Sequence, residues 1–209
     1  MKKKAIRNLA LLNILGLPVV AHAGVEVYGT GSAALENIDT DGPTSYTEIS
    51  NNHSAFGVKG DTEIAPGVKG VFMYDVFVGL DSGDAGGGTL FGGGRDGYVG
   101  MAGGFGTVAL GFHGRPWKTS TNHVDIFGST IADYSAVMGT TAGGEYFDGG
   151  IPNSFIWFAP NINGVSGHVQ IGADESHNGG DDGGIQINYA AGPMYLSLSH
   201  DIDGVAGAP

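Results

Sequence analysis

The chain has 209 residues, 40 glycines, no cysteine and a formal net charge of −12. Hydrophobic residues make up 41% of it and aromatic residues 10%, which argues against disorder, and the lack of a strict Gly-x-y repeat excludes collagen. The mean hydropathy is +0.04, and no apolar run reaches the ~20 residues that a membrane-spanning helix needs. These totals favour a β-rich protein. A transmembrane β-barrel fits them, because its apolar outward residues alternate with polar inward ones.

The first 23 residues predict a cleaved signal peptide. Four basic residues precede a short apolar stretch over 9–20, and residues 21–23 read Ala-His-Ala, the pattern of a cleavage site. A membrane anchor is the alternative, but Asn13 and Pro18 interrupt the apolar core. Cleavage before Gly24 removes four of the nine basic residues and no acidic one, which leaves 5 basic and 21 acidic residues, a net charge of −16. Such a surface would repel nucleic acid.

Period-two alternation predicts nine strands after residue 24. The strand over 68–80 is the clearest, with Phe72, Tyr74 and Val76 on one face and Lys69 and Asp75 on the other. The apolar face would turn inward in a soluble sandwich and outward in lipid, so one strand alone does not decide between them. The nine predicted strands cover residues 25–35, 46–61, 68–80, a stretch starting at 95, 107–113, 153–159, 165–173, 184–190 and 194–202.

Long polar loops alternate with short turns along the chain. This is the layout of outer-membrane barrels, which have short periplasmic turns and longer extracellular loops. The stretch over 114–152 lacks clear alternation, and loops of that length are usually functional. Aromatic residues near the strand ends, among them Tyr28, Phe155, Trp157, Phe158 and Tyr195, are typical of membrane-interface girdles, although ordinary strand propensity also favours them. The long loops cover 39–45, 81–94, 114–152 and 174–183, and the short turns cover 64–67, 103–106, 160–164 and 191–193.

Five segments resemble the general diffusion porins of the neisserial and β-proteobacterial type. They are SAFGVKG at 54–60, PGVKG at 66–70, RDGYVGM at 95–101, GGFGTV at 103–108 and FGSTIADY at 127–134. They match the family's second strand, its first periplasmic turn and third strand, its fourth strand, the next turn with the fifth strand, and its third loop. The resemblance spans essentially the whole mature chain, in order and with natural spacing.

The resemblance implies an all-β protein with an antiparallel transmembrane β-barrel of sixteen strands. It also implies a homotrimer in the outer membrane, in contact with lipid and lipopolysaccharide, and a long third loop folded into the lumen. Ions and small hydrophilic solutes would diffuse through passively, without catalysis, cofactor or metal.

The chain departs from the family pattern in two respects. About nine of the sixteen strands are present, whereas bacterial barrels have an even number, and the sequence ends in GVAGAP rather than in a strand with a terminal Phe. We therefore expect 24–209 to be a porin β-barrel domain that is incomplete at its C-terminus. The family also usually has Arg where this chain has Ala55, and basic residues around Ala109 and Phe112.

Charged side chains of the strands are expected to line the pore, because at the lipid midplane they would cost about 2–4 kcal/mol. If the long loop folds inward, its carboxylates face this wall, and the field between them would orient dipolar solutes. The missing arginines and the acidic surface predict a preference for cations relative to relatives with a basic lumen. The alternative is that the charges only solvate the rim. The predicted set is Lys59, Lys69, Asp75, Arg95, His113 and Arg115 on the wall, and Asp125, Asp133, Glu145 and Asp148 in the loop.

Three other functions compete with that of a channel. A membrane-embedded hydrolase would need a converging Ser, His and carboxylate, and no G-x-S-x-G motif is present. A calcium-binding β-solenoid would need a fixed short repeat, which is absent. A substrate-specific barrel stays open, because the sequence does not reveal the pore radius. The remaining acidic loop residues are expected to be solvated, since no EF-hand spacing occurs among Asp81, Asp84, Asp174, Glu175, Asp181 and Asp182.

Overall fold

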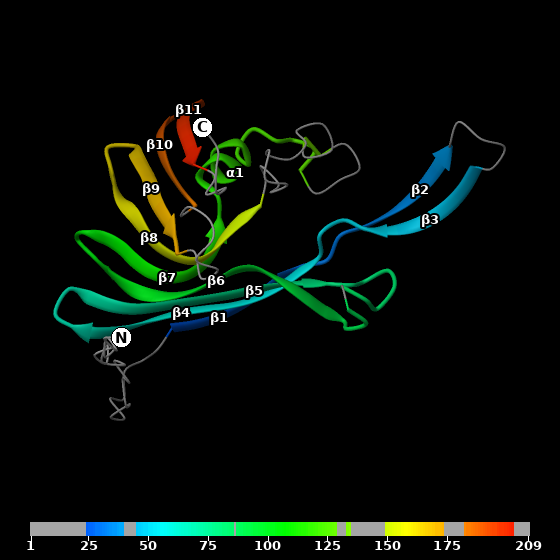
Figure 1. Ribbon diagram of the computed structural model, residues 1–209, viewed down its shortest axis with the longest axis horizontal. Coiled ribbons are helices and arrows are strands. Elements are labelled where there is room, and N and C mark those ends of the chain that lie inside the picture. Colours follow the sequence, from blue (N-terminus) through cyan, green and yellow to red (C-terminus); the bar gives the residue numbers. More distant parts are fainter. Residues whose placement is uncertain are drawn as a thin grey trace, which may run out of the picture.

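The structure, a computed structural model, describes residues 24–39, 45–85, 87–128, 133–134, 149–173 and 182–202. Its main feature is a strongly curved antiparallel sheet of nine strands, from which a two-stranded hairpin projects (Figure 1). The strand order in the sheet is β1-β4-β5-β6-β7-β8-β9-β10-β11, so neighbours in the sheet follow one another along the chain once the β2–β3 hairpin is set aside. The predicted all-β antiparallel fold is confirmed.

One short helix and eleven strands make up the described part of the chain. The strands are β1 Gly24–Thr30, β2 Ala33–Asp39, β3 Ser45–Asn51, β4 Ala55–Ala65, β5 Val68–Val78, β6 Phe91–Gly103, β7 Gly106–Gly114, β8 Gly150–Ile162, β9 Val165–Gly172, β10 Gly183–Ala191 and β11 Met194–Ile202, and the helix is α1 Pro116–Thr121.

The prediction of nine strands is right for the sheet and wrong for the first two strands. Each of these is broken in two, and the outer pieces form the separate hairpin β2–β3. The break is stabilised at the hairpin's base, where the Ser54 hydroxyl accepts from the Ser32 N–H at 2.9 Å and donates to the Ser32 carbonyl at 3.1 Å. His53 beside it has φ 53°, a left-handed conformation that ends the strand.

The four predicted short turns join β4 to β5, β6 to β7, β8 to β9 and β10 to β11. Because successive strands run antiparallel, all four turns lie at one end of the sheet and the longer connections lie at the other. Glycine supplies the left-handed conformation that tight turns need, as at Gly67 with φ 73° and Gly164 with φ 87°. The predicted alternation of turns and long loops is confirmed, with β6 beginning at Phe91 rather than at Arg95.

The sheet is apolar on its convex face and polar on its concave face. Register places Val27, Leu110 and Leu198 on the convex face, where they are 63%, 61% and 76% exposed. The concave face carries Asp75 and Gln186, which are buried, and α1 packs against it (Figure 1). A soluble sandwich buries its apolar face, so this arrangement decides the question in favour of a sheet whose apolar side faces lipid.

Candidate pore constriction

Helix α1 is held on the concave face by polar residues of β10 and β11. The Trp117 N–H donates to Asp201 Oδ2 at 3.2 Å, and the Ser120 and Ser199 hydroxyls lie 3.1 Å apart. Tyr195 OH donates to the Ser120 carbonyl at 3.2 Å. The chain enters the helix through Pro116, whose fixed φ suits the first helical turn. Several independent contacts therefore fix this segment inside the curve of the sheet.

Arg115, which precedes the helix, is buried rather than open to the pore. Its side chain is 3% exposed, and its Nη2 lies 2.9 Å from Asp182 Oδ2, just before β10. Its backbone N–H donates to the Gly149 carbonyl at 3.1 Å. Removing one partner of a buried ion pair is costly, because it leaves a desolvated charge. Arg115 therefore ties the start of α1 to the far part of the sheet, and this side chain offers no surface to a passing solute.

A cavity of about 520 Å³ separates the segment of α1 from the opposite wall. Wall strands β6 and β7 contribute Arg95, Asp96 and His113, and the long connection contributes Lys118, Asp125 and Asp133. The structure thus brings together four predicted residues, Arg95, His113, Asp125 and Asp133, around one space. The described beginning of the long third loop, residues 115–128, lies on the concave face, as expected. Glu145 and Asp148 lie outside the described residues, so their placement stays a prediction.

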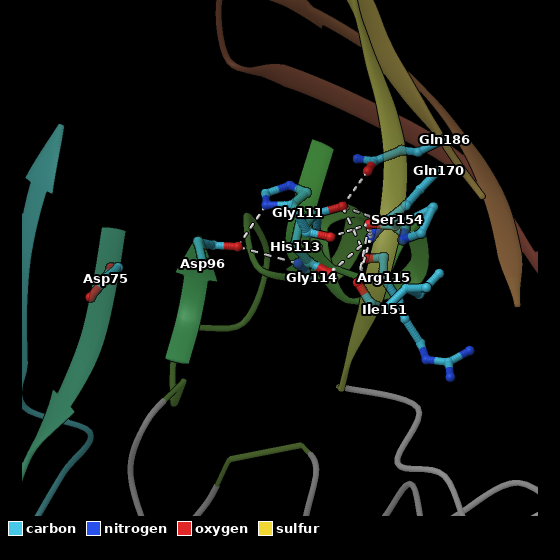
Figure 2. Close-up of polar contacts among 12 residues, drawn as sticks. Asp75, Asp96, Gly111, His113, Gly114, Arg115, Ile151, Ser154, Gln170 and Gln186 are labelled. Atoms are coloured by element: carbon cyan, nitrogen blue, oxygen red, sulfur yellow. Dashed lines mark hydrogen bonds and ion pairs between the residues drawn. The ribbon is translucent and has the colours of Figure 1, made fainter. Parts of the chain in front are cut away.

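Two carboxylates, Asp75 and Asp96, lie next to each other on the wall beside this cavity, and we call them the acidic row. Asp75 lies directly opposite Asp96 in the β5–β6 register, and Tyr28 OH donates to Asp75 Oδ2 at 3.3 Å. Asp96 Oδ1 lies 2.6 Å from His113 Nδ1 and accepts from the Gly114 N–H at 3.3 Å (Figure 2). Two directly opposed carboxylates repel each other across a ladder. This part of the wall is therefore a region of concentrated negative charge.

The predicted lysines lie on the concave face, as their alternation requires, and both are in ion pairs. Lys59 Nζ is 3.3 Å from Glu26 Oε1, and Lys69 Nζ is 2.7 Å from Asp61 Oδ1. About half of each lysine side chain is exposed, so screening keeps these pairs weak. Each lysine nevertheless presents the pore with a pair of opposite charges rather than with an isolated cation.

Arg95 lies at an irregularity in the β5–β6 ladder, next to Asp96. The register shifts between Asp75 and Val76, and the Arg95 guanidinium lies 5.2 Å from the centre of the Phe77 ring. Its Nη1 also donates to the His53 carbonyl at 3.4 Å. Stacking and this weak hydrogen bond hold the guanidinium at the cavity wall, toward the end of the sheet that carries the longer connections.

Four rings gather on the concave face next to the acidic row. Phe158 lies with its ring centre 5.8 Å from that of Tyr98, 5.0 Å from that of His113 and 5.6 Å from that of His168. The two histidine rings are 5.4 Å apart. We call Tyr98, His113, Phe158 and His168 the lumen rings.

Of the four lumen rings, the sequence predicts only His113 on the pore wall. The girdle prediction includes Phe158, Tyr28 and Tyr195, yet register puts all three on the concave face. Phe155 and Trp157 do face outward and are 44% and 37% exposed. The structure places Tyr98 on the concave face, two residues along β6 from Asp96, which pairs with Asp75.

A buried amide fixes the wall behind His113. Gln170 is fully buried, and its Nε2 donates to the carbonyls of His113 and Ile151 at 3.1 and 3.2 Å and to Ser154 Oγ at 2.9 Å (Figure 2). These bonds span the place where the β7–β8 register slips between Gly111 and His113. They satisfy backbone groups that the interrupted ladder leaves free.

Two negative findings concern the described residues. No helix among them is long and apolar enough to cross a membrane. In the same part of the chain, no group of three or more histidine, aspartate or glutamate side chains is placed to hold a metal ion.

A curved antiparallel sheet with an apolar convex face, a polar concave face and a loop segment folded over a cavity is the arrangement found in the wall of an outer-membrane β-barrel. Solved structures agree on the fold. An anion-selective porin from Comamonas acidovorans is similar, with a TM-score of 0.71 at 20% identity, over 88% of this chain and 59% of that one. OmpF of Salmonella typhi, in a complex with daunomycin, has a TM-score of 0.63 at 15% identity, over 85% and 53%.

The chain belongs to the Gram-negative porin family, whose model matches residues 10–208. Major outer membrane protein P.IB of Neisseria gonorrhoeae is 29% identical over 195 residues, which cover 88% of this chain and 53% of that protein. The P.IB protein of Neisseria lactamica is 27% identical, over 88% and 55%. The chain spans about half the length of these curated relatives. Family and relatives place it in the outer membrane.

Proposed function

We propose that the intact protein is a passive, water-filled channel for ions and small hydrophilic solutes. It would work as a homotrimer surrounded by outer-membrane lipid and lipopolysaccharide. The observation that carries the proposal is the cavity between the α1 segment and the polar concave wall. A path lined by polar groups and narrowed by a fixed loop selects by bore and charge, without energy input.

The test is the conductance of the full-length protein in a planar lipid bilayer. Stepwise current increases in potassium chloride, proportional to salt concentration, are expected for a water-filled pore. Ions of increasing size should give a cut-off in conductance that reports the bore. A protein that inserts into the bilayer and gives no such steps would contradict the channel function.

We further propose that the channel prefers cations. The mature part carries a net charge of −16, and Asp75 and Asp96 lie side by side on the wall, whereas Lys59, Lys69 and Arg115 are each engaged by a carboxylate. Negative charge around a narrow path raises the local concentration of cations. The reversal potential in a gradient of potassium chloride should therefore have the sign of cation preference. The opposite sign would rule this selectivity out.

Two features of the chain's processing and assembly belong to the same proposal. The signal peptide over 1–23 would be removed, which mass spectrometry of the purified protein checks by a mature N-terminus at Gly24. Residues 24–209 would be part of a larger barrel domain, and the trimer would appear as one species in native gel electrophoresis that dissociates to monomers on heating.

A further inference from the structure

We propose that the lumen rings and the acidic row together form a binding station for small organic cations that carry an aromatic ring. This rests on the proposed channel function, since the station lies on the face assigned to the pore. It deepens that function by naming a class of solute that the wall would hold in passage.

The first observation is the exposure of apolar surface on a face that is otherwise polar. Tyr98 and Phe158 are partly exposed on the concave side, with Met73 directly opposite Tyr98 in the β5–β6 register. The neighbouring inward positions, Gly100 and Ala109, are small, so the rings stand above their surroundings. Barrel interiors are mostly polar. Aromatic faces presented to water in such an interior are suited to stacking against a flat ring.

The second observation is space. A cavity of about 340 Å³ lies over this surface and is lined by Met73, Tyr98 and Phe158 together with the Glu26–Lys59 pair. Ligand pockets for small molecules start at roughly 300 Å³. The cavity can therefore take a single ring with a short chain. The charges of Glu26 and Lys59 offset each other at 3.3 Å and favour neither sign of solute.

The third observation is charge at a fitting distance. The Asp75–Asp96 pair lies two residues along the strands from the Met73–Tyr98 pair, a step of about 7 Å. Asp96 is about one quarter exposed and lines the larger cavity, while Asp75 Oδ1 is buried without a hydrogen-bond partner and adds negative charge behind it. A solute whose aromatic ring stacks on Tyr98 would thus bring an ammonium group near Asp96 if a two-carbon chain joins that group to the ring.

The same geometry selects against other solutes. A cation relieves the repulsion between the two opposed carboxylates, whereas an anion increases it. Arg95 and Lys118 also line the larger cavity, but the Arg95 guanidinium is stacked on Phe77 and bonded to the His53 carbonyl.

The test is calorimetric titration of the full-length, detergent-solubilised protein with phenethylammonium. Butylammonium is the probe with charge and no ring, and 3-phenylpropionate is the probe with a ring and the opposite charge. Phenethylammonium should bind about tenfold more tightly than either, as one good stacking contact next to a charge would give. Equal affinities for the two ammonium probes, or no binding of phenethylammonium, would overturn the proposal.

Variants locate the site. Tyr98→Leu and Phe158→Leu should each weaken phenethylammonium binding severalfold and leave butylammonium unchanged, whereas Asp96→Asn should weaken both. Phe155→Leu is the matched control, because Phe155 is an exposed ring on the convex face of β8, the strand that also carries Phe158. Tyr98→Phe keeps the stacking surface and should bind normally. If the leucine variants of the lumen rings bind as the unsubstituted protein does, the station is not there.

The channel is tested separately on the same preparation by its conductance in potassium chloride. Conductance without phenethylammonium binding would support the channel function and contradict the binding station. Binding without conductance would do the reverse. In a conducting channel, phenethylammonium should also block the current, at concentrations about tenfold lower than butylammonium requires.

Discussion

At the residue scale, one glycine sets the position of a charged group in the pore. The Tyr28 ring lies so close over Gly57 that a side chain there would collide with it, and this position lets Tyr28 OH reach Asp75. Lys59 Nζ in turn lies 5.1 Å from the centre of the Tyr28 ring. Gly57 thus governs how three neighbours are arranged, although it carries no side chain of its own.

Gly57→Ala is expected to displace Tyr28 and break its bond to Asp75. The free energy of unfolding, measured by denaturant titration in lipid vesicles, should fall by about 1–3 kcal/mol, the usual cost of forcing extra volume into a packed site. Gly97→Ala is the control, because a Cβ at Gly97 would meet no atom within 4 Å. Equal stability of the two variants would contradict the role assigned to Gly57.

Asp96→Asn is expected to lower the cation-to-anion permeability ratio, by a factor of up to about five. The removed charge borders the cavity, and a unit charge about 4 Å from an ion in water is worth about 1 kcal/mol. The measurement is the reversal potential in a salt gradient.

Asp81→Asn serves as the charge-matched control for Asp96→Asn. Asp81 is exposed beyond the end of β5, and the backbone N–H of Ser82 lowers the pKa of its carboxyl, so it carries the same charge away from the cavity. A reversal potential that responds equally to both substitutions would mean that overall charge, and not the wall at Asp96, sets selectivity.

At the element scale, the bore depends on how firmly α1 is held. Asp182→Asn removes one charge of the buried Arg115–Asp182 pair and leaves the guanidinium desolvated. Removing one partner of such a pair typically destabilises the folded state by about 3–5 kcal/mol. We expect the helix to move away from the wall, because that lets the guanidinium regain contact with water. Single channels of this variant should therefore show a larger conductance and more current noise.

The matched control for the helix anchor is Arg95→Gln. It also removes a charge next to the cavity, but Arg95 bonds the His53 carbonyl and does not hold α1. It should change ion preference and leave the current noise unchanged. Noise that rises as much in Arg95→Gln as in Asp182→Asn would contradict the anchoring role of Arg115 and Asp182.

Alternation identified the nine-strand sheet and its turns because each strand turns apolar side chains to the convex face and polar side chains to the concave face. It could not identify α1, since a six-residue helix is too short for a helical period and its sequence, PWKTST, contains three Ser or Thr residues. Only contacts with β10 and β11 make it stable. Alternation also failed to show the break at His53, because a strand that leaves the sheet has the same alternating pattern as one that stays in it.

The site could be predicted only in part, because alternation shows which face of a strand a side chain occupies but not what it contacts. Alternation predicts that Lys59, Lys69, Asp75 and His113 share one face of the sheet, and the register puts them on the concave face, but alternation names no partner for any of them. That Arg115 is buried follows from Asp182, 67 residues further along the chain. Pairings of this kind depend on the curvature of the sheet, which no local pattern specifies.

At the scale of the whole molecule, the apolar convex face predicts an asymmetric response to charge. Leu198, near the middle of β11, is 76% exposed on that face, so Leu198→Arg should cost about 2–4 kcal/mol in the free energy of unfolding in a phospholipid bilayer. Ser197→Arg, one residue away and on the concave face, should cost much less. Equal costs would mean that this face does not meet lipid.

The contacts that hold α1 also say something about the order in which the pore is assembled. Its partners Tyr195, Ser199 and Asp201 lie 75 to 84 residues further along the chain. Closing loops of this length is slow compared with forming the hairpins of the sheet. The wall can therefore form first and the constriction last, so an assembling barrel passes through a stage that is wider than the finished pore.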